Sequence, residues 1–506
     1  MLERGFRGQS SERFTDVDKQ MSIFILGQLL GQQDAEADAA ADDSDDSDEP
    51  KASDAPTDDS DAGAKKRKPG RRPLPEELPR VELELIPEEV KRDGLDAFTR
   101  VGEEVSETVE RRTASLVVVR ITRPKFVRKD RDRDAPTKFV VAPAQDLPIE
   151  RGLAGPNFLA ETVTLRFEDH MPGNRLQKRY KREGFDIVRS TLCRMHINLA
   201  NLCTPLIKAM WADAMAKSPY LCTDATGVMV QAKKKCTHGH FWVVIAPELH
   251  VLFRFTHDHN ALAVDSLISA YGYQGVLVSD AHSVYAHLYE DGTITKAGCW
   301  AHCRRYFLKA LSSEPERAKE AVVLIGKLFE IERKLKSATP KQRKAARKQR
   351  AGPVVAAFYK WCAEQGDYAI EQSPLHRALT YATNQRDALG RFLADGRIPI
   401  HNNDSERELR REAVGRKNWL FIGNDAGAKA NTTFVTLLAS CQMHGIEPQG
   451  YLRDLFCLLP NWPHRRVLEL APAYWKQTRE HAETQKLLAA NPFRTVALAE
   501  LKAHSA

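Results

Sequence analysis

The chain has 506 residues, of which 42% are hydrophobic and 28% charged. This composition is typical of a globular protein with room for two to four domains, and it excludes a wholly disordered chain. The longest apolar run near the start, residues 21–30, is shorter than the roughly 20 residues that a membrane-spanning helix needs. Nine scattered cysteines favour free thiols over a disulfide framework. We therefore expect a cytoplasmic protein without a membrane partner.

The formal net charge of +7 hides an asymmetry along the chain. Residues 1–62 carry 5 basic and 17 acidic groups, a balance of −12, so residues 63–506 carry +19. A strongly basic globular body is typical of a protein that binds a polyanion, although ordinary basic enzymes also reach such a surplus. Charge alone therefore favours nucleic acid as the partner without excluding other classes.

The first 80 residues are expected to lack a packed core. Residues 1–33 are interpreted as a short helical remnant, and residues 34–80 as a linker. The acidic start of this linker has almost no large apolar groups, so we expect it to be disordered. The basic run Lys65–Arg72 follows it and suits DNA phosphates or a minor groove, or equally a solvated linker that its charge keeps extended.

Two small units are predicted next. Residues 81–148 form a β-rich unit, whose clearest strand is Ser115–Thr122 because β-branched residues dominate it. Residues 149–217 are helical, and two short helices there flank a glycine turn at Gly184. The first of these helices has five basic residues in eight. The pair therefore resembles a helix-turn-helix, although any basic helical hairpin has the same pattern. Its candidate DNA contacts are Arg175, Lys178 and Arg179.

Residues 218–310 and 391–445 carry the pattern of an α/β core. Three strand-like runs are followed by a helix, a buried strand that ends at Asp280, a second helix, a short strand and a third helix. The order βββ-α-β-α-β-α is that of the ribonuclease H-like fold, a mixed sheet covered by helices on both faces. Residues 311–390 form a large helical insertion, and residues 446–506 are interpreted as a C-terminal tail without a chemical motif.

Three acidic residues are candidates for chemistry. Asp224 falls near the middle of the first predicted strand, where an acid is unfavourable unless it binds something or lies at a turn or edge. Asp280 ends a buried strand, where ligands bind in open α/β sheets, or where an aspartate caps the next helix. Glu406 follows Asn403 at the spacing of a capping box, so capping alone can explain it.

The residues that follow Glu406 favour a role beyond capping. Arg410 lies four residues on, on the same helical face, and other basic residues surround it. The candidate DNA contacts in this segment are Arg407, Arg410, Arg416 and Lys417. Carboxylates that converge require cations, and hard oxygen ligands select Mg²⁺ or Mn²⁺. Two such ions, about 3.5–4 Å apart, suit phosphodiester cleavage by water or joining by a 3′ hydroxyl.

Around these residues the chain resembles the insertion sequence 66 transposase family over most of its length. The resemblance rests on six motifs, the last of which is the longest: Lys68–Arg80, Pro148–Gly152, Asp224–Thr226, Ser279–Tyr285, Cys299–Phe307 and Ile400–Gly423. It implies a retroviral integrase-like core with an Asp224, Asp280 and Glu406 triad that binds two Mg²⁺ or Mn²⁺ ions. It also implies transposition of a bacterial element with terminal inverted repeats.

The same resemblance implies partners and a location. These are double-stranded DNA, as element ends and target, accessory proteins of the element, and other copies of the chain in a homo-oligomer on DNA at the nucleoid. Two departures stand out. Ala225 replaces the family's usual glutamate, and Glu88–Lys129, which corresponds to its zinc-binding segment, has no cysteine. No zinc is therefore predicted, and the unit has to fold by its own core. Little precedes Arg7–Arg13, which leaves open whether the start is truncated.

Several residues keep open interpretations. Cys299, His302 and Cys303 lack a second ligand pair at zinc-finger spacing, so His302 is assigned a supporting role beside the acids or packing on its helix. His257 and His259 are interpreted as loop polar groups. The run Trp419–Ile422 anchors its helix or stacks on a flipped base. Two other function classes stay open: a structure-specific nuclease with the same fold, and a catalytically impaired DNA-binding descendant of a transposase.

Overall fold

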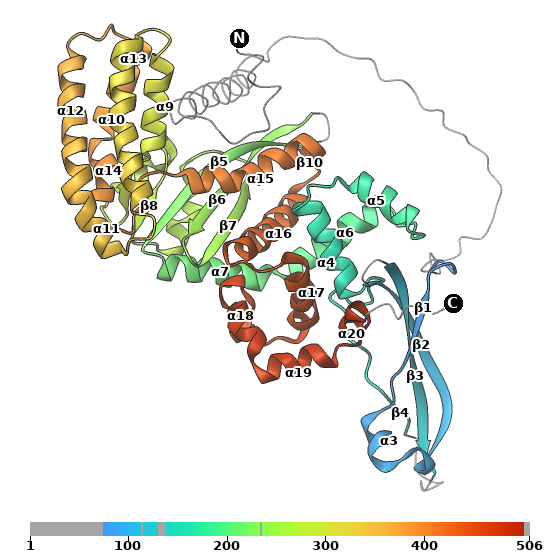
Figure 1. Cartoon of the computed structure of the whole chain (residues 1–506). Coiled ribbons are helices and arrows are strands. Elements are labelled where there is room, and N and C mark those ends of the chain that lie inside the picture. Colours follow the sequence, from blue (N-terminus) through green and yellow to red (C-terminus); the bar gives the residue numbers. More distant parts are fainter. Residues whose placement is uncertain (1–73, 113–114, 130–137, 233–234, 500–506) are drawn as a thin grey trace, which may run out of the picture. The chain divides into compact units, whose positions relative to one another are not determined.

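The computed structural model describes residues 74–112, 115–129, 138–232 and 235–499, which form two mixed β-sheets in a mostly helical protein (Figure 1). The predicted helical remnant, acidic linker and basic run up to Arg72 lie outside the described residues. None of the helices within these ranges is both long and apolar enough to cross a membrane. All nine cysteines are free thiols, as their spacing indicates.

The first sheet has the strand order β1-β3-β2, with β4 beside β3. The predicted strand at residues 115–122 is confirmed and is longer than expected, since it continues to Arg128. It pairs antiparallel with an equally long neighbour, which gives the ribbon visible in Figure 1. The bounds are β1 Arg80–Glu84, α3 Glu88–Asp93, β2 Phe98–Arg112, β3 Ser115–Arg128 and β4 Val140–Val141.

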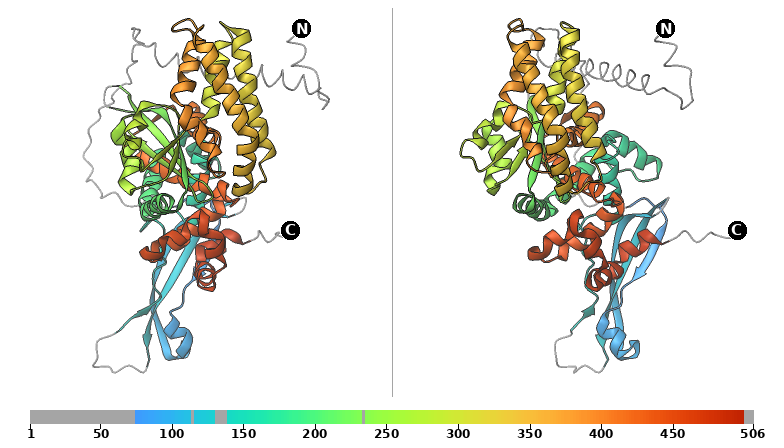
Figure 2. Two further views of the ribbon diagram at one scale, coloured as in Figure 1. Left: turned by 90° about the vertical axis from the view of Figure 1, so that its left-hand side faces the viewer. Right: turned by 60° about the vertical axis from the view of Figure 1, so that its left-hand side comes forward.

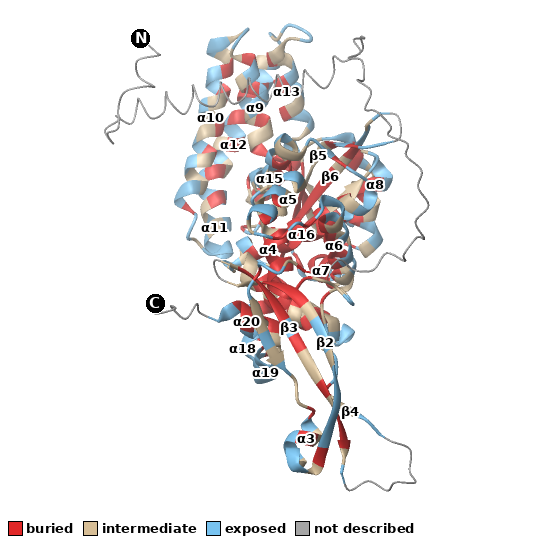
Figure 3. Cartoon of the chain, turned by 90° about the vertical axis from the view of Figure 1, so that its right-hand side faces the viewer, coloured by how far each residue is buried: buried red, intermediate tan, exposed pale blue. Residues whose placement is uncertain are grey.

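The expectation that this sheet folds by its own core is wrong. Val117, Val119 and Ile121 of β3 pack against Phe493 and Val496 of the helix α20 (Pro492–Leu498), far away in sequence. Burial in Figure 3 is accordingly concentrated at the end of the ribbon beside α20. Only a small cluster at the other end belongs to the unit itself: Val90, Phe98 and Phe126.

Four helices follow, and they include the predicted pair around a glycine turn. Gly184 has a φ of 85°, a left-handed conformation that favours glycine, and it separates the two helices of the pair. The buried residues of all four belong to the largest hydrophobic core. Their bounds are α4 Pro156–Phe167, α5 Gly173–Arg182, α6 Arg189–Leu202 and α7 Thr204–Lys217.

The second sheet has the order β7-β6-β5-β8-β9, with β10 beside β5. The first three strands form an antiparallel meander, and β8 and β9 lie parallel to β5, so the element order expected from the sequence is confirmed. The bounds are β5 Tyr220–Val230, β6 Thr237–Ala246, β7 His250–Thr256, α8 Ala261–Leu267, β8 Val276–Val278, the 3-10 helix η3 Ser283–Tyr289, β9 Thr295–Ala297 and β10 Phe421–Ile422.

Helices cover both faces of this sheet, and one also covers its edge. Trp242 faces the core that contains α4 and α7, whereas Val243, next along β6, faces the core that contains α9 (Trp300–Ala310). At the edge strand β7, the backbone N–H groups of Val251 and Phe253 donate to Ser440 Oγ (3.1 Å) and Thr436 Oγ1 (2.9 Å) of α16 (Asp425–Met443). These bonds occupy donors that an open edge would present to other chains.

The helical insertion stands beside this sheet (Figure 2). Its two ends are pinned next to β9, because Gly298 N donates to Ala388 O (2.9 Å) and Trp300 N donates to Ile400 O (3.0 Å). The insertion therefore returns the chain to the sheet just before α15 (Asn403–Trp419). Its helices are α10 Pro315–Lys334, α11 Pro340–Ala346, α12 Gly352–Gly366, α13 Pro374–Asn384 and α14 Arg386–Gly390, with a π-helical turn at Arg347–Ala351.

The region interpreted as a tail is instead largely helical and packed. Several of its prolines lie in the first turn of a helix, where proline is tolerated because the backbone N–H groups of that turn have no partner within the helix. Pro448, Pro472 and Pro492 each stand at the start of a helix. The segment forms α17 Pro448–Leu458, α18 Pro472–Glu480, α19 Ala482–Ala490 and α20, of which α17 packs on α4.

Candidate active site

Asp224 and Asp280 each lie two residues beyond the last register pair of the neighbouring parallel strands β5 and β8. In the parallel pair, Cys222 of β5 lies opposite Val278, the last residue of β8. Two residues further along each chain are Asp224 and Asp280, and adjacent strands lie about 4.8 Å apart. The two aspartates are thus brought together at the point where β8 ends and β5 continues.

Electrostatics place Glu406 in the same group. The pKa of Asp224 is raised to about 7: burial raises it most, the charges of Asp280 and Glu406 also raise it, and the Ala225 N–H and Arg305 lower it. The Ala225 N–H donates to Asp224 Oδ1 at 2.8 Å. A carboxyl at this site therefore retains its proton much more readily than an exposed aspartate.

The helix-capping explanation for Asp280 does not hold. The next helix, η3, is capped by His282, whose Nδ1 accepts from Val284 N at 3.2 Å. Asp280 Oδ1 accepts only the backbone N–H of His282, at 3.1 Å, among the described residues. The Asp280 side chain lines a cavity of about 640 Å³ together with His302 and Tyr306.

The capping-box explanation for Glu406 is also wrong. The N-cap of α15 is Asn402 rather than Asn403. Asn402 is fully buried, its Nδ2 donates to Thr223 O (2.8 Å), and its Oδ1 accepts from Ser405 Oγ (2.9 Å). Because Thr223 precedes Asp224, this amide fastens the start of the glutamate helix directly to the aspartate strand.

Glu406 is held by two residues of α9. Arg305 Nη2 donates to Glu406 Oε1 at 2.9 Å, and His302 Nε2 lies 3.4 Å from the same oxygen. Burial lowers the pKa of His302, as does Arg305, while Glu406 and Asp280 raise it. His302 therefore contacts a candidate carboxylate, and Arg305 is a partner that the sequence did not single out.

The structure separates the residues that invite a zinc interpretation. Cys299 Sγ accepts from Asn402 N at 3.2 Å, whereas Cys303 is buried in the core beneath α9. His257 Nε2 lies 3.0 Å from Asp425, and the His259 ring stacks on Trp242. Within the described ranges, no three His, Cys, Asp or Glu side chains stand close enough in this arrangement to hold one metal ion.

The basic candidates divide into exposed and engaged side chains. Arg179 is engaged, because its Nη2 lies 3.0 Å from Glu161 and its Nε 3.0 Å from Glu183, so we remove it from the candidate DNA contacts. Arg416 is engaged as well, since its Nη1 donates to Gly227 O. The candidates on the surface are Arg175, Lys178, Arg407, Arg410 and Lys417, of which Arg407 pairs with Asp404.

These features define a class: an α/β protein in which three carboxylates interact through their charges. One lies on a strand, one follows the neighbouring parallel strand, and one belongs to a later basic helix. Comparison with known proteins agrees with that class. The model described as Transposase IS66 family matches residues 151–430, and the chain belongs to this family. A second model, described as Transposase C of IS166 homeodomain, matches residues 3–83.

Individual relatives come from Sinorhizobium fredii (strain NBRC 101917 / NGR234). The uncharacterized protein y4hP is 30% identical over 444 residues, covering 81% of this chain and 78% of its own length. The uncharacterized protein y4qI is 29% identical over 437 residues, covering 81% of this chain and 79% of its own. Both alignments span most of the two chains, so the similarity is not confined to one motif.

Proposed function

We propose that the chain is a DNA transposase that cleaves and joins DNA with a ribonuclease H-like core, using Asp224, Asp280 and Glu406. The observation that carries this proposal is that Asp224 and Asp280 each lie two residues beyond the last register pair of the parallel strands β5 and β8, with Glu406 close enough to contribute to the raised pKa of Asp224. Family membership supports a transposase and hence DNA as the partner.

The three carboxylates suit divalent cations by their chemistry, although in the described structure they do not stand close enough together to hold one ion. Carboxylate oxygens are hard ligands that favour Mg²⁺ or Mn²⁺. Burial raises the pKa of Asp224 most and the charges of Asp280 and Glu406 add to it, and a bound cation would relieve that repulsion. Two bound ions would supply an activated attacking oxygen and a stabilised leaving oxygen.

The chain's own residues would position these groups. Asn402 fixes the start of α15 to Thr223 beside Asp224, while Arg305 and His302 orient the Glu406 carboxylate. The exposed Arg407, Arg410 and Lys417 on α15 would bind phosphates next to the carboxylates. The α5–α6 pair would present Arg175 and Lys178 to the duplex.

The proposed substrates are the terminal inverted repeats of the element and a target duplex. Residues 3–83 match a model whose name refers to a homeodomain, which supports a further DNA contact made by that segment. Accessory proteins of the element and further copies of the chain on DNA complete the proposed complex.

The test is cleavage and joining in vitro. The donor plasmid carries the DNA that flanks the gene, with its inverted repeats, and Mg²⁺ is supplied. We expect Asp224→Asn, Asp280→Asn and Glu406→Gln each to abolish cleavage and strand transfer while end binding persists. Glu364→Gln, an exposed carboxylate of α12, serves as the control and should remain active.

The outcomes separate the classes that the sequence leaves open. Cleavage without strand transfer into a target plasmid would indicate a nuclease. Binding of the ends without cleavage by the wild-type chain would indicate an impaired descendant. Unchanged cleavage in any one of the three variants would remove that residue from the triad.

A further inference from the structure

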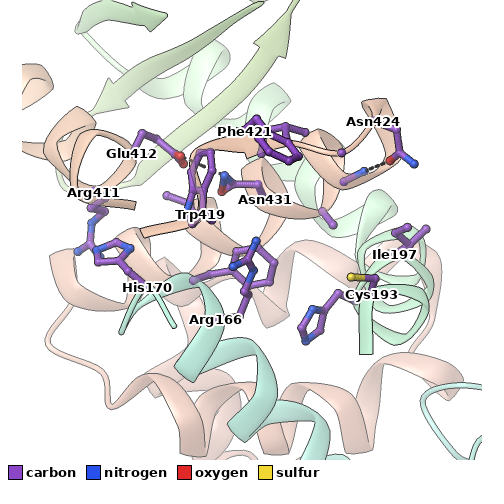
Figure 4. A pocket seen from close by; sticks show the side chains of 17 residues that line it. Arg166, His170, Cys193, Ile197, Arg411, Glu412, Trp419, Phe421, Asn424 and Asn431 are labelled. Carbon is purple, nitrogen blue, oxygen red and sulfur yellow. Dashed lines mark hydrogen bonds between the residues drawn. The ribbon is translucent and has the colours of Figure 1, made fainter. Parts of the chain in front are cut away.

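A second cavity is lined by residues of the helices before the second sheet and by residues of the segment from α15 to α16. It measures about 190 Å³ and lies between α4, α6, α15, β10 and α16 (Figure 4). This space is large enough to hold several waters or one planar base. Six residues dominate its chemistry: Arg166, Phe167, Glu412, Trp419, Phe421 and Asn431.

Buried polar atoms of this cavity lack partners. Glu412 is 2% exposed and Asn431 5% exposed, and Asn431 Nδ2 donates to Glu412 Oε2 at 3.0 Å. Glu412 Oε1 and Asn431 Oδ1 have no hydrogen-bond partner among the described residues. An unpaired buried polar atom costs about 1–3 kcal/mol, so a ligand that donates to Asn431 Oδ1 and forms a hydrogen bond with Glu412 Oε1, a donor when this carboxyl is protonated, recovers that energy.

A hydrogen-bond donor faces the same space. Arg166 points into the cavity toward Trp419 and Asn431 (Figure 4). Within the described part of the chain it forms no ion pair, and its hydrogen bond to Met171 O is long, at 3.4 Å. The cavity therefore offers acceptors and a cationic donor, which matches the mixed edge of a nucleobase.

Aromatic rings stand at the mouth of the cavity, and the local backbone holds them there. The two rings are those of Trp419 and Phe421, and Phe421 is 41% exposed. Leu420, which stands between them in the sequence, is 68% exposed and has a φ of 65°. Such a conformation is strained for leucine, and strain of this kind clusters at functional sites. Gly415 leaves room for the Trp419 indole, since a Cβ there would lie 2.7 Å from its Nε1.

A groove with three arginines, Glu168 and Glu408 adjoins this cavity, and Arg411 pairs there with both glutamates. His170 and Arg411 line both spaces, and the groove continues along α15 past Arg407 and Arg410. Glu412 stands six residues after Glu406 on the same helix, or about 9 Å along its axis at about 1.5 Å per residue. A DNA strand whose phosphates lie on the exposed Arg407 and Arg410 would therefore run along the helix that carries both Glu406 and Glu412.

We propose that this cavity binds one unpaired nucleobase of the DNA, stacked against Trp419 and Phe421 and hydrogen-bonded to Arg166, Glu412 and Asn431. The proposal rests on the proposed function, since it takes DNA as the partner. Extruding a base costs least where the duplex is already disrupted, so the cavity would favour DNA with an unpaired base.

The test measures binding by the full chain in EDTA, where no cleavage occurs. The probes are a duplex with one unpaired 2-aminopurine, the same duplex with an abasic bulge, and the fully paired duplex. Stacking of one base predicts that the 2-aminopurine duplex binds about 5- to 100-fold tighter than the abasic one. Its fluorescence should also be quenched on binding by the wild-type chain.

Two variants and one control locate the effect. Trp419→Ala and Phe421→Ala should each reduce the preference for the unpaired base, and Phe421 is exposed enough for its removal to spare the fold. Tyr368→Ala, an aromatic residue 77% exposed after α12, should keep it. Equal affinity of the wild-type chain for the abasic and base-carrying bulges would overturn the proposal. That result would leave metal-dependent cleavage untouched, whereas failed cleavage with intact base preference would overturn only the catalytic proposal.

Discussion

Replacement of Arg347 by methionine should destabilise the helical insertion and the segment that leads to α15. Arg347 is 1% exposed, and its Nε and Nη2 donate to the two oxygens of Glu332 at 2.8 and 2.7 Å. Its Nη1 donates to the carbonyls of Phe392, Asp395 and Ile398 at 2.8–2.9 Å. One guanidinium thus joins α10 to the chain just before Glu406.

The expected magnitude follows from what the substitution leaves behind. Arg347→Met leaves the largely buried Glu332 carboxylate and three backbone carbonyls without their donor. Removal of one partner of a buried ion pair costs about 3–5 kcal/mol. Lysine has fewer donors and no planar fork, so Arg347→Lys should recover only part of this loss.

Urea unfolding followed by tryptophan fluorescence is a suitable assay, because Trp300 and Trp361 belong to the same hydrophobic core. Arg333→Met is the matched control: its side chain is 76% exposed, its pair with Glu330 is 3.9 Å long, and its effect should stay within about 0.5 kcal/mol. A loss below about 1 kcal/mol for Arg347→Met would refute the proposed anchoring role.

Three further predictions concern α15 and its surroundings. Asn402→Ala should lower the free energy of unfolding by about 1–3 kcal/mol and slow cleavage, because it removes the hydrogen bonds to Thr223 and Ser405. Asn403→Ala, at an exposed position, should do neither. Equal effects of the two substitutions in thermal melts would contradict the assignment of Asn402 as the N-cap. Burial raises the pKa of Glu412 from 4.5 to about 8, with Arg416, Arg411 and Arg166 partly offsetting it. The folded chain then keeps a proton that the unfolded chain loses, so stability should fall between pH 4.5 and 8 by at most about 1.4 kcal/mol per pH unit. Glu412→Gln should flatten that fall, and parallel melting profiles of the two chains would argue against a protonated Glu412. Finally, Arg410→Gln or Lys417→Gln should each reduce the salt slope of DNA binding by about 1, while Arg179→Gln should lower stability and leave the slope unchanged.

Much of the second sheet follows from local sequence. The strands β5 to β7 have β-branched and aromatic runs, and β8 is a short buried run that ends before an acid, so their order is readable from period and composition. The matching positions of Asp224 and Asp280 require in addition the parallel register of β5 and β8, which no local pattern determines.

What could not be predicted depends on contacts between distant segments. The pairing of β3 with α20 joins residues more than 300 positions apart in sequence, so the β-rich unit seemed to need a core of its own. Asn402 and Asn403 are equivalent as caps by residue type, and only the bond to Thr223 distinguishes them. Arg179 looks like its exposed neighbours until Glu161 and Glu183 are placed beside it.

The most direct test of the three carboxylates as metal ligands is single-turnover cleavage of an element end by Asp224→Cys and Asp280→Cys. A thiolate is a softer ligand than a carboxylate and suits Mg²⁺ poorly. Each variant should lose cleavage in Mg²⁺ and regain part of it in Mn²⁺. Full cleavage in Mg²⁺ by either variant would contradict a role for that carboxylate in binding the catalytic metal.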